Sequence, residues 1–257
     1  MESAVDSALR HGYRLFDSAL IYKNDAELGV ALEKSLPKHG LYRSDIFITS
    51  KLLPQPSNNT ELIPQLFQGI LQRLRIDYVD LLLIHSPKPR FGEGQTASES
   101  TLAEYRKDVW IAFEALLAAG KVRSIGVSNY NTTHLGEMHA YASVRPAVNQ
   151  VQFNPYHQER ALLDYCRKEG IFLQAYRSIT PRGQNDEAKL TEQSVVKRVA
   201  EKRGVKPAIL LLSYALSQGV GVIPKSTNDE HIRENYQCVV QMSEEEIAEL
   251  NSVNGDH

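Results

Sequence analysis

The segment RLFDSALIYKNDAELGVALEKS, at residues 14–35, contains the pattern on which the fold prediction rests. It begins with a short apolar run at residues 14–17 and ends at residues 26–35 with apolar side chains at helical spacing. Polar residues and one tyrosine separate the two. A strand, a loop and a helix in this order form one βα unit.

The same order recurs along the chain and predicts a parallel sheet with helices between its strands. Gly12, Gly120, Gly170 and Gly219 each stand between a predicted helix and the next strand, where a left-handed cap residue is preferred. No GxGxxG or GxxxxGK[ST] motif follows a strand, so a barrel is preferred to an open doubly wound sheet. The expected strands are residues 14–17, 46–50, 79–84, 124–127, 148–151, 172–175 and 220–223, and the expected helices include residues 26–35, 62–74, 109–118, 135–141, 160–168, 194–202 and 208–217.

Length and composition favour one globular domain, residues 1–257, that binds a small molecule. The chain is 42% hydrophobic, and its formal net charge of -2 argues against a nucleic-acid partner or a membrane surface. No apolar run approaches the roughly 18 residues that span a bilayer. Cys166 and Cys238 form no CxxC pair, so neither a disulfide framework nor a metal site is suggested. We expect a cytoplasmic protein.

Two stretches are predicted to be long loops. Residues 86–101 contain two prolines and two glycines, and residues 178–187 follow the strand at 172–175 without helical spacing. Long loops in compact domains are usually functional. In a parallel barrel both would lie at the carboxyl ends of the strands, where active sites are built.

Four ionisable residues stand at or just beyond the ends of three consecutive predicted strands, so in a barrel their side chains would converge over one opening. Carbonyl reduction needs a proton donor for the oxygen while a cofactor supplies hydride to the carbon. A nearby ammonium would lower the high pKa of a tyrosine, a carboxylate would keep that ammonium charged, and a histidine could orient the substrate oxygen. The four are Asp17, Tyr22, Lys51 and His85.

Each of the four also has a structural interpretation. Asp17 could cap a turn, and Tyr22 could pack as an aromatic side chain. Lys51 could be a solvated charge at a strand end, and His85 a hydrogen-bonded core residue. Taken singly, the structural role is favoured, but their joint placement favours catalysis.

Several segments, in order from about residue 4 to about residue 250, carry a more specific pattern. On these segments the chain resembles the aldo-keto reductase family, whose signature includes D-[ST]-A-x-x-Y. The matches are DSALIY at residues 17–22, ITSKL at 48–52, YVDLLLIHSP at 78–87, GKVRSIGVSNY at 120–130, NQVQFNP at 149–155, IPKST at 223–227 and IRENY at 232–236.

The resemblance implies an (α/β)8 barrel, an oxidoreductase that transfers hydride from NADPH to an aldehyde or ketone, and a monomer if the barrel is complete. It implies an Asp–Tyr–Lys–His catalytic set carried by the four residues above. The cofactor residues implied are Ser128, Asn129 and Gln150 at the nicotinamide carboxamide, Tyr176 stacked on its ring, Lys225 and Ser226 at the adenosine 2′-phosphate, and Glu234 and Asn235 near the adenine.

The chain departs from the family pattern in four places. Residues 177–180 replace the usual Ser-Pro-Leu-Gly after Tyr176, and His231 stands where an arginine commonly binds the 2′-phosphate, which weakens the expected preference for NADPH. The family's first strand is expected to be missing, leaving an incomplete barrel of about seven strands. The tail that ends at His257 is short. The missing strand supports an alternative function, a non-catalytic nucleotide-binding barrel that acts as a regulatory subunit or an inactive truncated isoform.

Overall fold

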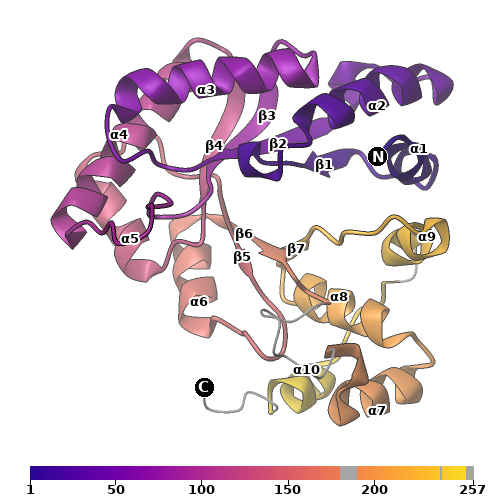
Figure 1. The fold of residues 1–257 in the computed structure, drawn as a ribbon. Coiled ribbons are helices and arrows are strands. Elements are labelled where there is room, and N and C mark those ends of the chain that lie inside the picture. Colours follow the sequence, from indigo (N-terminus) through magenta and orange to yellow (C-terminus); the bar gives the residue numbers. More distant parts are fainter. Residues whose placement is uncertain (180–189, 238, 253–257) are drawn as a thin grey trace. The chain divides into compact units, whose positions relative to one another are not determined.

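The computed structural model describes residues 1–179, 190–237 and 239–252 (Figure 1). The predictions for Cys238, for Thr180 and for the tail lie outside these residues, as does most of the stretch 178–187. Seven strands lie in the described part, each within two residues of its expected bounds. They are β1 (Leu15–Asp17), β2 (Phe47–Leu52), β3 (Val79–Ile84), β4 (Val122–Ser128), β5 (Val148–Gln152), β6 (Phe172–Tyr176) and β7 (Gly221–Val222).

Helices alternate with the strands as expected, and short 3-10 turns occur between them. The helices are α1 (Glu2–Arg10), α2 (Asp25–Lys38), α3 (Asn59–Leu74), α4 (Glu99–Ala118), α5 (Thr132–Glu137), α6 (Arg160–Glu169), α7 (Ser194–Arg203), α8 (Pro207–Ser217), α9 (Asp229–Gln237) and α10 (Glu244–Asn251), and the 3-10 turns are η1 (Leu20–Tyr22), η2 (Arg43–Asp45), η3 (Met138–Ala140) and η4 (Leu190–Glu192). In the described part, no helix has both the length and the apolar character needed to cross a bilayer.

The chain divides into two compact units, Met1–Asn149 and Gln150–His257, and β5 begins in the first and ends in the second. A single domain over residues 1–257 therefore remains a prediction. All four glycines predicted to cap helices have positive φ, at 102°, 68°, 70° and 73° in chain order. That part of the sequence interpretation is confirmed.

In the first unit, strands β1 to β4 pair in parallel and in chain order. Helix α1 packs against α2, α2 against α3 and α3 against α4, so the helices follow the strands in the same order (Figure 1). Every residue of β3 is buried, as expected for a parallel strand covered on both faces. This arrangement brings the carboxyl ends of four strands to one edge of the sheet.

The amino ends of the same strands are held by a buried carboxylate. Asp80, 2% exposed, accepts hydrogen bonds from Arg43 at 2.7 Å, from the amide of Ile48 at 2.9 Å and from Arg123 at 3.3 Å. Both guanidinium groups lie 4.1 Å from the ring centroid of Tyr78. The two guanidinium groups lie on the tyrosine ring and pair with the buried carboxylate of Asp80. These contacts stabilise the amino ends of the strands.

The loop predicted at residues 86–101 is shorter than expected, because α4 begins at Glu99. Ser98 caps the helix by accepting a hydrogen bond from the amide of Thr101 at 3.2 Å. The sequence pattern predicts this helix only from residue 109 and so misses the first turns of α4. The reason is Arg106, which is 1% exposed and interrupts the apolar pattern at a buried position. Arg106 donates to Glu137 at 2.8 Å, which joins α4 to α5.

The second unit is organised around α8, whose sequence PAILLLSYALS is apolar on nearly all sides and largely buried. Helices α7 and α9 pack against it, and α10 packs against α7. Strands β6 and β7 pair in parallel, with Gln174 opposite Gly221 and Ala175 opposite Val222. A helix that is apolar all round must be enclosed by its neighbours, which accounts for its central place in this unit.

Gly126 in β4 is expected to tolerate no side chain. A β-carbon there would lie 2.6 Å from the carbonyl oxygen of Val148 and 2.8 Å from Cδ2 of Leu83. Because a backbone oxygen cannot turn aside, Gly126→Ala should lower the free energy of unfolding by about 3 kcal/mol. Gly69→Ala is the control, because a β-carbon at this position would meet only the flexible end of Arg73, at 3.0 Å. This substitution should stabilise α3 by up to about 1 kcal/mol. Urea denaturation measures both, and equal midpoints for Gly126→Ala and the parent would contradict the packing argument.

Candidate active site

The four ionisable residues predicted to converge lie together at the carboxyl edge of the first unit. Asp17 ends β1, and Tyr22 ends the 3-10 turn η1 that follows it. Lys51 lies inside β2 rather than just beyond it, because the strand continues to Leu52, and His85 comes directly after β3. Parallel pairing of the three strands places these positions at one edge.

Lys51 is the most deeply buried of the four, with 1% of its surface exposed. Its ammonium donates a short hydrogen bond to Oδ1 of Asp17 and a second, of 2.9 Å, to the carbonyl oxygen of Ser18. Burial lowers the pKa of the Lys51 ammonium, and the carboxylate of Asp17 opposes that effect. The sequence predicted the ion pair, but burial and not the pair has the larger effect on the pKa.

Tyr22 lies over this ion pair and beside the histidine. Its ring centroid is 5.2 Å from Nζ of Lys51 and 5.7 Å from the ring centroid of His85, with an interplanar angle of 89°. The side chain is 48% exposed, so one part of it packs in the site and another can meet a bound molecule. The cation near the ring face and the edge-on histidine both favour this position.

His85 is held through its backbone, whose amide donates to the carbonyl of Leu52 at 2.8 Å and whose carbonyl accepts from Asn129 at 2.8 Å. Its Nδ1 is buried and has no hydrogen-bond partner among the described residues. Burial, together with the charges of Lys51 and Arg90, lowers the pKa of His85 to about 4. The imidazole is therefore neutral near pH 7.

Two of the predicted nicotinamide residues adjoin this group of side chains. Ser128 ends β4 and is buried, while Asn129 follows it with φ of 61°, a left-handed conformation that asparagine tolerates. The amide of Asn129 donates to Oγ of Ser128 at 3.1 Å as well as to the backbone of His85. The side chain of Asn129 thus ties the end of β4 to the residue that follows β3.

The other two predicted nicotinamide residues belong to the second unit. Gln150 is buried and donates to Oε1 of Gln174 at 2.8 Å. Tyr176 is the last residue of β6 and is half-buried. Tyr176 lies at the carboxyl end of its strand, whereas Gln150 is the middle residue of β5.

The residues predicted at the 2′-phosphate lie between β7 and α9. Lys225 is exposed, and Ser226 accepts a hydrogen bond from the amide of Asn228 at 3.1 Å. Asn228 in turn accepts from the amide of His231 at 3.0 Å, and His231 is exposed. The segment therefore presents a cation and a hydroxyl beside the start of a helix.

Glu234 and Asn235, predicted near the adenine, lie on α9. The carboxylate of Glu234 already accepts a hydrogen bond from Lys206 at 2.6 Å and lies 3.9 Å from Arg233. The bond from Lys206 lowers the pKa of Glu234. Asn235 is half-buried on the same helix. The ion pair with Lys206 was not foreseen, because the two residues are far apart in the sequence.

Two further residues that sequence analysis did not single out act on the site. The backbone of Ser18 supplies the second acceptor for Lys51, and Arg90 adds positive charge that acts on His85. Ser18 stands inside the segment quoted first, and Arg90 inside the predicted loop at 86–101. Their positions were visible in the sequence, but no motif connected them to these partners.

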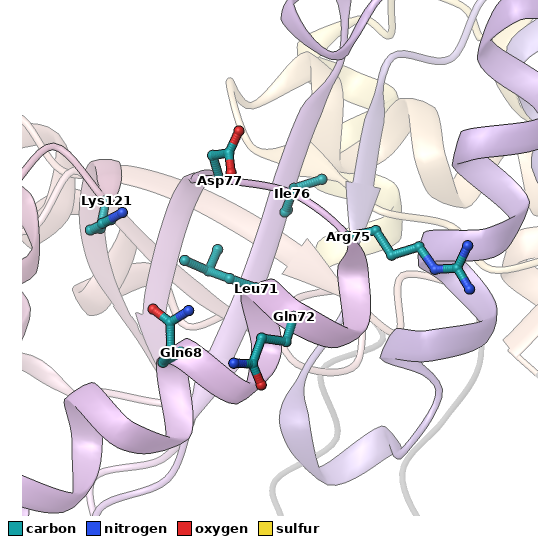
Figure 2. A pocket seen from close by; sticks show the side chains of 7 residues that line it. All are labelled: Gln68, Leu71, Gln72, Arg75, Ile76, Asp77 and Lys121. Carbon is teal, nitrogen blue, oxygen red and sulfur yellow. The ribbon is translucent and has the colours of Figure 1, made fainter.

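A hollow of about 280 Å³ lies elsewhere in the first unit (Figure 2). Asp77 and Lys121, two of its lining residues, precede β3 and β4, so it is at the amino ends of the strands and away from His85. Arg75, turned away from Lys121 in Figure 2, pairs with Glu33. The hollow is therefore no part of the candidate active site. Its lining residues are Gln68, Leu71, Gln72, Arg75, Ile76, Asp77 and Lys121.

Ionisable side chains gathered at the carboxyl ends of parallel strands are typical of α/β-barrel enzymes. The model of the Aldo/keto reductase family matches residues 1–255. D-galacturonate reductase of Hypocrea jecorina is 36% identical over 265 residues, covering 100% of this chain and 83% of that protein. Glyoxal reductase of Bacillus subtilis (strain 168) is 34% identical over 255 residues, covering 98% of this chain and 83% of that protein. The aldose reductase structure from Schistosoma japonicum has a TM-score of 0.85 and 33% identity, covering 98% of this chain and 83% of that one.

The chain therefore belongs to the aldo/keto reductase family, oxidoreductases that reduce carbonyl groups and generally use a nicotinamide cofactor. The predicted fold class is confirmed as well. The seven strands of the described residues match an incomplete (α/β)8 fold of the aldo-keto reductase kind.

The lowered pKa of His85 should make stability depend on pH. Between pH 6.5 and about 4 the unfolded chain binds a proton at this imidazole that the folded chain does not, so stability should fall as pH falls. The loss should be at most about 3 kcal/mol, reduced by solvent screening. In His85→Asn, which has no imidazole at this position, this contribution to the dependence of stability on pH should disappear. Urea denaturation of both proteins from pH 7 to pH 4 measures the difference, and identical slopes would show that burial does not lower the pKa of His85.

Proposed function

We propose that this chain is an NADPH-dependent reductase that transfers hydride to the carbonyl carbon of an aldehyde or ketone and gives an alcohol. The observation that carries the proposal is the pair of buried Lys51 with Asp17 beneath a half-exposed Tyr22, beside a neutral His85. That group contains a proton donor, a cation to act on it and an uncharged hydrogen-bonding ring. Proton transfer to a carbonyl oxygen needs a positioned donor, and the cation and the ring can act on that donor and on the oxygen.

In this mechanism the substrate oxygen lies between the hydroxyl of Tyr22 and Nε2 of His85. His85 orients the oxygen through a hydrogen bond, which a neutral imidazole can donate from Nε2. NADPH, when bound, supplies the hydride that adds to the carbonyl carbon. Tyr22 gives its proton to the oxygen and later regains one from solvent. The ammonium of Lys51 favours the deprotonated tyrosine that remains, because opposite charges attract more strongly in a buried site.

The cofactor proposal carries the roles implied by the family resemblance to the matching residues, one by one. Ser128, Asn129 and Gln150 would hold the carboxamide, and Tyr176 would stack on the nicotinamide ring, since a planar ring gains from an aromatic surface. Lys225 with Ser226 would hold the 2′-phosphate. Of the adenine candidates, Asn235 is the better one, because Glu234 is already paired with Lys206.

We propose a small-molecule carbonyl compound as the substrate. Two relatives are named for the reduction of D-galacturonate and of glyoxal, so these compounds are the first to test. A cytoplasmic location is part of the same proposal, and a monomeric state belongs to it only for a complete barrel. Loss of NADPH absorbance in the presence of either compound tests for the reductase, whereas NADPH binding without turnover would support the non-catalytic alternative.

Tyr22→Phe should lower kcat by about 10²-fold or more, because it removes the proton donor and leaves the ring in place. The dissociation constant for NADPH should change little, since the hydroxyl acts on the substrate oxygen. Steady-state rates and fluorescence titration with NADPH measure the two quantities. A variant that keeps the parental kcat would exclude Tyr22 as the proton donor.

Lys225→Ala should weaken NADPH binding by about tenfold or more and leave NADH binding nearly unchanged, because only NADPH carries the 2′-phosphate. His231→Arg should have the opposite effect and strengthen NADPH relative to NADH, since arginine adds a permanent charge. Fluorescence titrations with both nucleotides give the ratios. Equal losses for the two nucleotides in Lys225→Ala would place this lysine away from the 2′-phosphate.

A further inference from the structure

Ser18 fastens the segment after β1 to the neighbouring strand. It is 1% exposed, and its amide donates to the carbonyl of Thr49 in β2 at 2.9 Å. Its own carbonyl accepts the 2.9 Å hydrogen bond from Lys51 described above. Any movement of the Ser18 backbone therefore moves an acceptor of the Lys51 ammonium.

The side chain of Ser18 is held by a second buried residue. Its hydroxyl donates to Oδ1 of Asp25 at 3.0 Å, and Oδ1 of Asn24 lies slightly farther away, at 3.3 Å. Asp25 is the first residue of α2 and is 1% exposed. Its other oxygen accepts from Arg73 at 3.4 Å, and the helix start also favours a negative charge there. A buried carboxylate with these partners has one well-defined position.

The bond between Ser18 and Asp25 closes the loop of residues 19–24, and Tyr22 lies within that loop. One end of the loop is fixed to β2 through Ser18, and the other begins α2. Lys23, next to the tyrosine, has φ of 56°, so the chain turns sharply there. The closed loop thus sets the position of the Tyr22 ring over Lys51.

We propose that Ser18 and Asp25 form a clamp that positions both Tyr22 and the Lys51 ammonium for proton transfer. This inference rests on the proposed reductase function. Neither residue needs to touch the substrate, so both are positioning residues. Displacement of a reacting group by about 1 Å can cost about 10²-fold in rate, which is enough for such a clamp to control turnover.

A purely structural role is the competing interpretation, because Asp25 also joins α2 to Arg73 of α3. Asp80 offers a matched control. It is likewise a buried aspartate that accepts from arginines, but it lies at the amino ends of the strands. Asp25→Asn and Asp80→Asn should both lower stability, whereas only Asp25→Asn should act on the chemistry.

The experiment compares Ser18→Ala, Asp25→Asn, the double variant, Ser18→Thr and Asp80→Asn in the full chain. Ser18→Ala and Asp25→Asn should each lower kcat between about tenfold and 10²-fold, with KM and the dissociation constant for NADPH within about twofold of the parent. The double variant should be no slower than the slower single variant, because both remove one interaction. Ser18→Thr keeps the hydroxyl and should retain most of kcat. Asp80→Asn should keep the parental kcat.

Hydrogen–deuterium exchange gives a measurement that does not need activity. Amides of residues 19–24 should exchange faster in Ser18→Ala and Asp25→Asn but not in Asp80→Asn. If the parent protein reduces no carbonyl compound, the proposed function fails, while exchange still tests the clamp. Ser18→Ala removes only a hydroxyl and so tests it even if Asp25→Asn does not fold.

Three results would overturn the clamp. One is a parental kcat in Ser18→Ala or Asp25→Asn. Another is an equal fall of kcat in Asp80→Asn. The third is exchange at residues 19–24 that stays at the parental rate in both clamp variants.

Discussion

The buried ammonium of Lys51 is the constraint on which the candidate site depends. A charge taken out of water costs several kcal/mol unless it is paired and hydrogen-bonded. Asp17 and the carbonyl of Ser18 supply those partners, and both come from the end of β1 and the residue after it. The pairing of β1 with β2 therefore has to be in register for the lysine to be tolerated at all. The same register places Tyr22 above the ammonium.

Burial acts in the same direction on the two basic groups of the site. It lowers the pKa of Lys51 and that of His85, but their surroundings differ. The carboxylate of Asp17 opposes the effect of burial on the pKa of Lys51. The positive charges of Lys51 and Arg90 add to the effect of burial on the pKa of His85. The carboxyl ends of neighbouring strands thus hold two different pairs. One is an ammonium beside a carboxylate, and the other is a neutral imidazole beside a tyrosine. Perturbed groups in one small region are typical of functional sites.

The two ends of the first unit's strands carry different groups of charged side chains. At the amino ends, Asp80 accepts hydrogen bonds from Arg43 and Arg123, whose guanidinium groups both lie on the ring of Tyr78. At the carboxyl ends, the pKa values of Lys51 and His85 are lowered, and Tyr22 is half-exposed. Active sites of parallel barrels are built at the carboxyl ends of the strands, whereas the amino ends contribute to stability. This division is the general arrangement of parallel α/β barrels.

Much of the fold could be predicted from the sequence, because strands, helices and glycine caps depend on local spacing and backbone preference. The start of α4 could not, since Arg106 occupies a buried position where the pattern requires an apolar residue. The four residues of the site could be named from their places at strand ends and from the resemblance at DSALIY. The clamp of Ser18 and Asp25, the pair of Glu234 with Lys206 and the directions of the pKa shifts were decided by tertiary structure. Hydrogen bonds to a backbone carbonyl and the cost of burying a charge depend on which groups surround an atom in space, and no local pattern of residues contains that information.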